Sequence, residues 1–501
     1  MESSLNATVR RTGGFTRRRL SIAVATAGLS ALLTRVSGTS IAEADEPNPG
    51  NPLPQSANFD HLFRRAGFGA RADERQSAVN RGWNATVERL VKFNQVPNDD
   101  LDMRLTELKL DLTKTADLQQ WWLARMVWTD RPLEEKMTLF WHGLLTSSVI
   151  NARPPEMLIQ NQFLREHALA DCRTILKGIT KDAAMLRWLN GASNRKTQPN
   201  ENYARELMEL FTLGRTDMRT GQPNYGERDV REAARALTGF RFTGPKDQEI
   251  VEFDPRQHDV GQKTVLGRTG NWGPDEVVGI IFEREGPAYY IAARLVRFFF
   301  LPPPYVSGPG RDMVERVAKA LLDSDYKMDA AVTAMFLAPE FRAPSAYRAL
   351  VKSPAEYLAG MYRQLDAPIV KGLPQQMARM GQSLFSPPNV AGWPGGKAWL
   401  STGTWLARLN AANALTTTRG NSEVADGLAS AMRTLPAGST DAYVDGVVDL
   451  LLDGQLMENQ RAALMEFARS VPGDPTSPYW RDTVGRAVVY LALGLPEYHL
   501  A

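Results

Sequence analysis

The sequence predicts a mainly α-helical fold: a multi-helix globular bundle with a small β-hairpin insertion and a long loop rich in glycine and tryptophan. Three observations predict it. Apolar residues recur at helical spacing through most of the chain after Phe59. Alternating β-branched and aromatic residues are confined to residues 240–266. Residues 385–404 follow neither period and are rich in Gly, Pro and Trp.

The composition is that of an ordinary globular protein. The chain has 501 residues, of which 43% are hydrophobic and 23% charged. The net charge is only +3, and part of the basic excess lies near the N-terminus, so no strong electrostatic footprint for nucleic acid remains. Cys172 is the single cysteine, which excludes an intrachain disulfide and a multi-cysteine zinc site. We expect it to be a small buried apolar residue.

The N-terminus has the pattern of a twin-arginine signal peptide over residues 1–44. Arg17 and Arg18 precede a modestly apolar run at 22–33, which is too short to cross a bilayer as a helix. Ala-Glu-Ala at 42–44 offers a cleavage site between small residues. Weak hydrophobicity together with paired arginines favours the twin-arginine translocase over the general secretory route.

This leader predicts a periplasmic or extracellular protein whose mature chain begins near Asp45. The alternative is a leader that is kept as an uncleaved anchor. Residues 45–58 are rich in Pro, Asn and Gly and are expected to be a linker, and residues 59–501 a single large helical domain. No stretch after the leader is apolar enough to predict a transmembrane span.

Helical periodicity, with Pro at the expected starts and Gly or Pro at the expected ends, predicts the main helices. They are expected at 118–128, 133–147 after Pro132, 155–170, 200–213 before Gly214, 226–238 before Gly239, from about 275, and 289–300 before Pro302. The last of these is the most apolar, so we expect it to lie at the centre of the fold.

Two short strands are predicted where the period changes. Residues 240–243 and 249–253 alternate, and Gly244-Pro245 can turn the chain between them. Residues 263–266 are expected to add a third strand. The segment 385–404 is expected to be an irregular loop, and loops on a rigid scaffold commonly carry functional sites.

Four long motifs give the chain a resemblance to a known family. They are Asn200-Glu-Asn-Tyr-Ala-Arg-Glu-Leu-Met-Glu-Leu-Phe-Thr-Leu-Gly214, Asp229-Val-Arg-Glu-Ala-Ala-Arg-Ala-Leu-Thr-Gly239, Phe253-Asp-Pro-Arg-Gln-His-Asp259 and Asn389-Val-Ala-Gly-Trp-Pro-Gly-Gly396. From about residue 59 to 415 the chain resembles domain-of-unknown-function family 1800, a group of exported bacterial proteins. The resemblance implies no settled activity. It does suggest a partner, because genes of this family often lie beside those of a sulfatase-like exported companion, domain-of-unknown-function 1501.

One histidine departs from the family pattern. Relatives often have a second histidine two places after His142, but here the stretch reads Trp141-His142-Gly143-Leu144. A two-histidine metal site is therefore not available at this position. Since His142 follows two aromatic residues in an apolar helix, we expect a hydrogen-bonded core histidine.

The first candidate site is the acidic helix of the first motif. Glu201, Arg205 and Glu209 share one face, while Asn202, Glu206 and Glu209 share another. We predict Glu206 as a catalytic carboxyl group, with Arg205 tuning its charge and Asn202 contacting substrate. The alternative is a set of structural Glu–Arg pairs, each stabilising the helix by about 0.2–0.5 kcal/mol.

The second candidate site is the loop after residue 253. Asp254, His258 and Asp259 have the side chains of a divalent-metal site, or of a base and its orienting partner. The alternative is a turn capped by aspartate, with a hydrogen-bonded histidine that closes the hairpin.

The third candidate site is the tryptophan loop. Trp393 and Trp399 lie among Gly392, Gly395 and Gly396, whose backbone can make tight turns. Exposed indoles would form flat platforms for the apolar faces of sugars. Alternatively, the indoles pack inward and hold the loop to the helices.

Three functions remain open from the sequence. The leading hypothesis is a hydrolase of a periplasmic or extracellular carbohydrate polymer, with Glu206 and Asp259 as acid and base and His258 as orienting residue. The second is a non-catalytic export or surface-assembly partner of the sulfatase-like protein. The third is a metal-dependent hydrolase at Asp254, His258 and Asp259. The first requires that the three stretches meet in one polar pocket.

Overall fold

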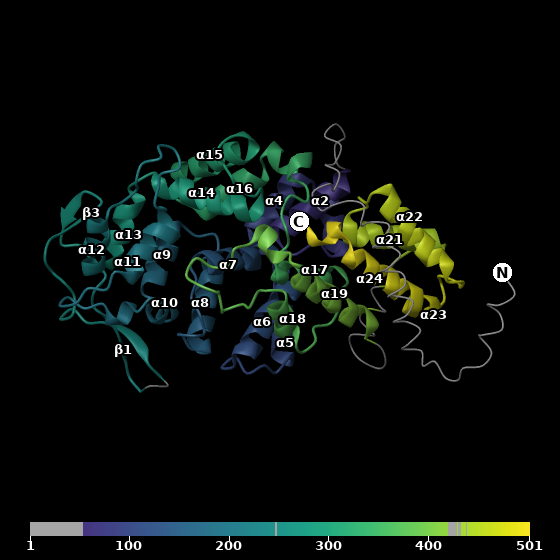
Figure 1. Cartoon of the computed structure of the whole chain (residues 1–501), viewed down its shortest axis with the longest axis horizontal. Helices are drawn as coiled ribbons and strands as arrows, with labels where there is room; N and C mark the ends of the chain where they lie inside the picture. Colours follow the sequence, from purple (N-terminus) through teal and green to yellow (C-terminus); the bar gives the residue numbers. More distant parts are fainter. Residues whose placement is uncertain (1–53, 246–247, 419–427, 429–431, 437) are drawn as a thin grey trace. The chain divides into compact units, whose positions relative to one another are not determined.

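Helices make up most of the protein in the computed structural model, which describes residues 54–245, 248–418, 428, 432–436 and 438–501 (Figure 1). The described residues form two compact units. The larger contains 54–363, 370–407 and 501, and the smaller contains 364–369 and the described part of 408–500. The expected leader and most of the expected linker lie outside the described residues. The first described helix, α2 (Gln55–Ala66), begins ahead of the predicted domain start.

The predicted fold class is confirmed: the protein is mainly helical with small antiparallel sheets. Before the first sheet, the larger unit contains α3 (Ala72–Arg81), α4 (Trp83–Val91), α5 (Asp99–Glu107), α6 (Thr115–Trp128), α7 (Pro132–Leu144), α8 (Pro154–Glu166), α9 (Cys172–Thr180), α10 (Ala183–Trp188), α11 (Asn202–Glu206) and α12 (Glu227–Ala236). After the sheets come α13 (Pro274–Phe282), α14 (Gly286–Phe299), α15 (Gly308–Asp323), α16 (Met328–Phe336), α17 (Pro354–Gln364) and α18 (Leu373–Arg379). The next helix, α19 (Thr402–Thr417), begins in the larger unit, and its residues from Arg408 onward belong to the smaller one.

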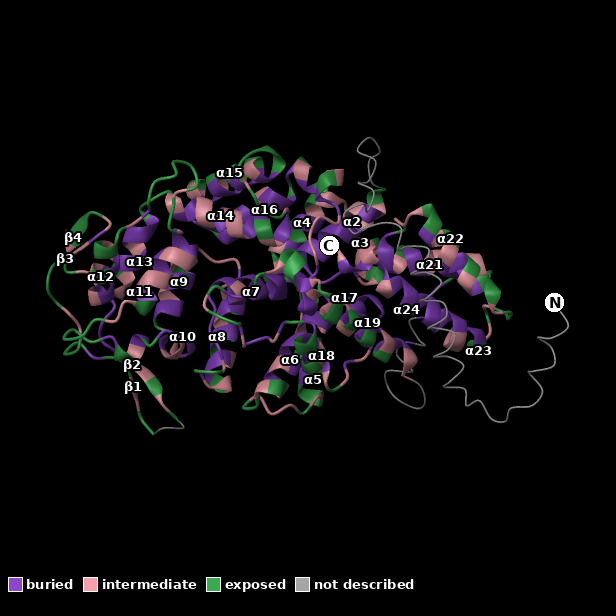
Figure 2. Cartoon of the chain, in the orientation of Figure 1, coloured by how far each residue is buried: buried purple, intermediate pink, exposed green. Residues whose placement is uncertain are grey.

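Helix α14 is central to the hydrophobic core, as its apolar sequence predicts. It packs against α15, which in turn packs against α16. On α14, Ile291 and Leu295 are fully buried, and the ring of Phe299 lies 5.6 Å from that of Phe336 on α16. Helix α15 has buried residues on one side and exposed residues on the other (Figure 2). Burial of each such side chain stabilises the fold by about 1.5–3 kcal/mol.

The acidic helix differs from the prediction in its second half. The α-helical part, α11, ends at Glu206 and continues as a π-helix, η4 (Leu207–Thr212). The wider turn ends where the backbone N–H groups of Leu213 and Gly214 both donate to the Met208 carbonyl, at 2.9 and 3.1 Å. It buries Leu207, Met208, Phe211 and Thr212 together. π-Helical turns of this kind frequently occur at functional sites.

The predicted hairpin and the predicted third strand are both confirmed, and the third strand lies in a second sheet. Strand β1 (Phe240–Thr243) pairs antiparallel with β2 (Ile250–Phe253), with Phe240 opposite Phe253. Strand β3 (Lys263–Val265) pairs instead with β4 (Arg268–Gly270). Leu266 and Gly267 both have positive φ, +50° and +84°, so the chain reverses directly after β3 in the tight turn typical of a two-residue hairpin.

The smaller unit contains its own packed helices. These are α21 (Thr440–Leu452), α22 (Glu458–Ser470), α23 (Pro478–Trp480) and α24 (Arg486–Gly494). Both α22 and α24 pack on α21, and the rings of Tyr443 and Trp480 meet edge to face at 5.2 Å. Across both units, the described helices include none with the length and apolarity needed to cross a membrane.

Candidate functional site

The guanidinium group of Arg205 is held in an ion-pair network at the surface. It donates two hydrogen bonds of 2.8 Å to the Glu227 carboxylate on α12 and one of 3.0 Å to Glu201. These contacts raise the pKa of Arg205, chiefly through the hydrogen bond to Glu227. Arg205 therefore joins α11 to the start of α12, which agrees with the structural alternative for this residue. Asn202 is exposed, and its backbone N–H donates to the side chain of Asn200 at 3.0 Å.

Glu206 is different from the other charged residues of its helix. Its carboxyl group is half-buried and makes no hydrogen bond or ion pair with any residue that the structure describes. Burial raises the pKa of Glu206, and the nearby charge of Glu209 raises it further. Glu209 itself pairs with Arg215 at 2.8 Å and accepts a hydrogen bond of 3.1 Å from the Tyr225 hydroxyl. Glu206 and Glu209 thus form a pair of carboxyl groups in unlike surroundings.

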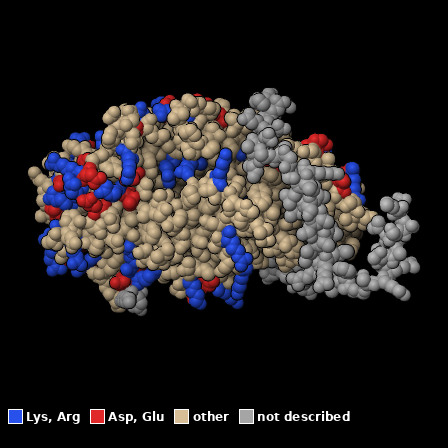
Figure 3. All heavy atoms as spheres, in the orientation of Figure 1, with Lys and Arg blue, Asp and Glu red and all other residues tan. Residues whose placement is uncertain are grey.

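Helix α14 places cationic and phenolic groups beside this pair. The Tyr290 hydroxyl donates to the Leu210 carbonyl at 2.6 Å, and burial raises the pKa of Tyr290. The charges of Arg294, Glu209, Arg297 and Glu206 all act on the same phenol. Neither arginine forms an ion pair with a described residue. Basic side chains run along the lower edge of α14 in Figure 3, with no acidic ones among them.

The tryptophan loop also meets α14. Arg297 donates a hydrogen bond from its guanidinium group to the Pro394 carbonyl, one residue after Trp393. Trp393 is half-buried, and its ring lies 5.6 Å from the imidazole of His142. Trp399 is only 6% exposed, in the 3₁₀-helix η7 (Gly396–Trp399). Trp399 therefore packs inward and has no open face for a sugar, whereas Trp393 keeps part of its surface in solvent.

His142 is the core histidine that the sequence predicted. Its Nε2 accepts a hydrogen bond from the Phe385 backbone N–H at 3.1 Å. The rings of Trp122 and Phe385 lie 5.1 and 5.3 Å away. Burial lowers the pKa of His142 to about 3, so the imidazole is neutral at physiological pH. Its role is to tie the start of the tryptophan loop to α7.

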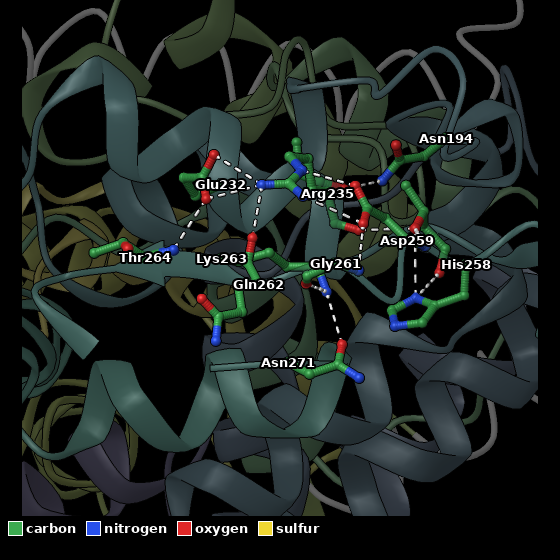
Figure 4. Close-up of polar contacts among 12 residues, drawn as sticks. Asn194, Glu232, Arg235, His258, Asp259, Gly261, Gln262, Lys263, Thr264 and Asn271 are labelled. Carbon is green, nitrogen blue, oxygen red and sulfur yellow. Dashed lines mark hydrogen bonds and ion pairs between the residues drawn. The ribbon is translucent and has the colours of Figure 1, made fainter. Parts of the chain in front are cut away.

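Asp259 belongs to a separate network around Arg235 on α12 (Figure 4). Arg235 Nε donates to the Asp259 carboxylate at 2.7 Å, and Arg235 also pairs with Glu232 at 3.0 Å. The hydrogen bond from Arg235 lowers the pKa of Asp259. Glu232 in turn accepts the backbone N–H of Thr264 at 2.9 Å, so the network holds β3 on α12.

The other two residues of this loop are directed to other partners. His258 Nδ1 donates to the Thr238 carbonyl at 2.9 Å, and its ring packs 5.4 Å from that of Phe253. Asp254 accepts the backbone N–H of Arg256 at 3.0 Å and pairs with that side chain at 3.2 Å. This is the aspartate-capped turn with a hydrogen-bonded histidine that the sequence left open. Among the described residues, no three His, Cys, Asp or Glu side chains are grouped as a metal site requires.

Of the three predicted site stretches, the acidic helix and the tryptophan loop both lie next to α14. Glu206 and the tryptophan loop both adjoin α14, at Tyr290 and Arg297 respectively. Asp259 is not among the charged groups that act on Glu206, which are Glu209, Arg205 and Arg215. Sequence reasoning did not single out Arg294 and Arg297 on α14. The available signal was a pair of arginines one turn apart in an otherwise apolar helix.

One family comparison covers nearly all of the described chain. The family model described as "protein of unknown function (DUF1800)" matches residues 61–500. The chain belongs to the DUF1800 family. The match continues past residue 415, where the resemblance was expected to end, and takes in the smaller unit. No curated protein and no solved structure matches the chain. The DUF1800 description names no activity, so the function has to be inferred from the residues and geometry of the site.

Proposed function

We propose that this DUF1800 protein is an exported hydrolase of a periplasmic or extracellular carbohydrate polymer, with Glu206 as its acid–base residue. One observation carries the proposal. Within the described chain, the half-buried Glu206 carboxyl group has no partner, while Arg205, Asp254 and Asp259 are all occupied by ion pairs. A perturbed, unpaired carboxyl group directly before a π-helical turn is typical of a functional position.

Glu209 replaces Asp259 as the second carboxylate of the proposal. Glycoside hydrolysis commonly uses two carboxyl groups whose surroundings separate their protonation states. Burial and a neighbouring negative charge favour the protonated form of Glu206, which suits a proton donor. Glu209 is ion-paired with Arg215, and its position suits a carboxylate that stabilises positive charge developing on the sugar.

The tryptophan loop supplies the contact with the polymer in this proposal. Trp393 retains a partly exposed indole, and Arg297 fixes the adjacent backbone through the Pro394 carbonyl. An indole face suits the apolar face of a sugar ring. The twin-arginine leader that the sequence predicts supports export, to the compartment in which a protein would meet extracellular polymers.

The test is polysaccharide hydrolysis by the purified mature protein, measured as new reducing ends over a panel of neutral and acidic polymers. Glu206→Gln should lower kcat at least about 100-fold, because general acid–base catalysis typically contributes that much. Glu201→Gln is the matched control, since Glu201 lies on the same motif but only pairs with Arg205. Activity of Glu206→Gln equal to that of the control, or no hydrolysis by the natural protein, would refute the proposal.

A second function is favoured by the closed ion-pair networks. In that case the protein is a non-catalytic export or surface-assembly partner of the sulfatase-like DUF1501 companion. The networks of Arg205 and Arg235 join α11 to α12 and α12 to β3, as a structural framework requires. Co-purification of the two exported proteins, unchanged by Glu206→Gln, would support this function over hydrolysis.

A further inference from the structure

A polar hollow lies in the larger unit, away from Glu206, at the junction of α3, α4 and the start of α7. Its volume is about 220 Å³. Apolar side chains line it at Phe63, Leu90 and Phe93, and charged side chains on α3, on α4 and around residues 130–131 supply most of the rest. A second hollow of about 280 Å³ shares Arg81 and Arg89 with the first.

The three carboxylates of the hollow share two arginine partners. Asp73, Glu74 and Asp130 all form ion pairs with Arg71, and Glu74 pairs also with the buried Arg363. Asp73 is the least engaged of the three, since its carboxylate lies 3.9 Å from Arg71 and its side chain is 80% exposed. Arg131 donates through its Nε to the Val96 carbonyl at 2.7 Å, which leaves it only partly available.

Arg81 and Arg89 are the cations without a carboxylate partner among the described residues. The Arg81 side chain donates only to the Ser77 hydroxyl of its own helix, at 2.9 Å, and the Arg89 side chain makes no hydrogen bond within the described chain. Each guanidinium group can bind an oxyanion with two parallel N–H donors. Arg81 and Arg89 line both hollows, and no carboxylate of the described chain pairs with them. Their guanidinium groups can therefore bind an anion.

Arg81 and Arg89 lie on consecutive helices, α3 and α4, which are joined by the single residue Gly82. Helix α3 ends at Arg81, and Gly82, with φ of +84°, turns the chain directly into α4, which carries Arg89. A residue with a side chain would be strained at this φ. Leu90 of α4 also lines the hollow and is 5% exposed, and Phe63, another lining residue, is 6% exposed.

We propose that this hollow binds a small organic anion. The oxyanion, a carboxylate or a phosphate ester, pairs with Arg81 and Arg89, and a short apolar group rests on Phe63, Leu90 and Phe93. The volume fits a compact ligand of about one ring, since sites for drug-sized molecules are about 300–1,000 Å³. The site is independent of Glu206 and of any hydrolysis there.

Calorimetric titration of the mature protein with phenyl phosphate, phenylacetate and inorganic phosphate tests the proposal. At least one aromatic anion should bind, and at least 10-fold more tightly than inorganic phosphate. The two aromatic anions distinguish a phosphate ester from a carboxylate as the preferred group. Failure of both to bind, or equal affinity for inorganic phosphate, would overturn the proposal.

Variants locate the binding. Arg89→Ala and Arg81→Ala should each weaken it at least 10-fold, and both side chains are exposed, so the fold should be retained. Arg228→Ala is the matched control, because Arg228 is an exposed arginine on α12 outside the lining of the hollow. Ser77→Trp should abolish binding by filling the hollow while both arginines remain. Affinity unchanged by Arg89→Ala and Ser77→Trp would place the anion elsewhere and overturn the proposal.

Discussion

Arg235 and Asp259 form an ion pair in which Nε donates to the carboxylate at 2.7 Å, joining α12 to the loop after β2. The pair is partly buried, since the side chains are 28% and 17% exposed. Asp259 also accepts the Gly261 backbone N–H at 2.8 Å. Its carboxylate is therefore occupied by structural contacts in the described chain.

The Asp259→Asn variant should be less stable than the natural protein. Loss of charge-assisted hydrogen bonds of this kind costs about 1.5–3 kcal/mol. Urea unfolding followed by circular dichroism measures the change. Asp325→Asn is the control, because Asp325 also pairs with an arginine but is 77% exposed, and exposed pairs contribute about 0–1 kcal/mol. Equal losses in the two variants would contradict a structural role for Asp259.

Acid should remove the contribution of Asp259. Because the hydrogen bond from Arg235 lowers its pKa in the folded state, the contribution is present above the unfolded value of about 3.9. It is lost as pH falls through the lower folded pKa. The stability difference between the natural protein and Asp259→Asn should therefore shrink as pH falls below about 4. A difference that stayed constant from pH 6 to pH 2.5 would show that the carboxylate charge has no part in it.

The Glu206→Gln variant should be more stable than the natural protein, whereas Asp259→Asn should be less stable. Burial raises the pKa of Glu206, so folding disfavours its ionised form, and stability falls as pH rises from the unfolded pKa through the folded one. Removal of the charge should therefore stabilise the protein at pH 7, and the gain should disappear below about pH 4. Thermal melts at pH 7 and pH 4 measure this. A lower melting temperature at pH 7 would mean that the carboxylate has a favourable partner.

Gly392→Ala should destabilise the tryptophan loop. Gly392 has φ of +80°, and a Cβ there would lie 2.6 Å from the Gly143 carbonyl oxygen. Left-handed backbone alone costs about 1–2 kcal/mol in a residue with a side chain, and the clash adds to it. Gly396→Ala isolates the backbone term, since Gly396 has φ of +57° and nothing within 4 Å of the added carbon. Chemical unfolding should show the larger loss for Gly392→Ala, and equal losses would argue against close packing on α7.

Substitution of Trp399 should mainly reduce stability, whereas substitution of Trp393 should mainly reduce polysaccharide binding. Trp399→Ala should cost about 3–5 kcal/mol, because the indole is 6% exposed and its removal leaves a cavity. Trp393→Ala should cost less but weaken polysaccharide binding, measured by affinity electrophoresis in gels containing the polymer. If Trp393→Ala migrates like the natural protein in every polymer, the loop is not the sugar contact.

The sequence predicted the elements whose cause is local. Proline and glycine punctuation set α7 and α14, and alternating residues set β1 and β2. The predicted third strand is present as β3, but its pairing with β4 could not be predicted, because it depends on the reversal at Leu266-Gly267. The π-helical second half of the acidic helix was missed for a related reason. A helical period shows which residues are apolar, but it does not show that Leu207, Met208 and Phe211 must all be buried at once.

By itself, then, the sequence determined the helical class, the central apolar helix, the buried His142 and the family. These follow from spacing, composition and long motifs within the chain. Only the tertiary structure decided which carboxyl groups are occupied. Asp259 and Glu206 both carry a carboxyl group, but their surroundings differ. Arg235, from another element, pairs with Asp259. Glu206 has no such partner, and burial together with the charge of Glu209 raises its pKa. Pairing depends on distances between elements far apart in sequence, which no local pattern contains.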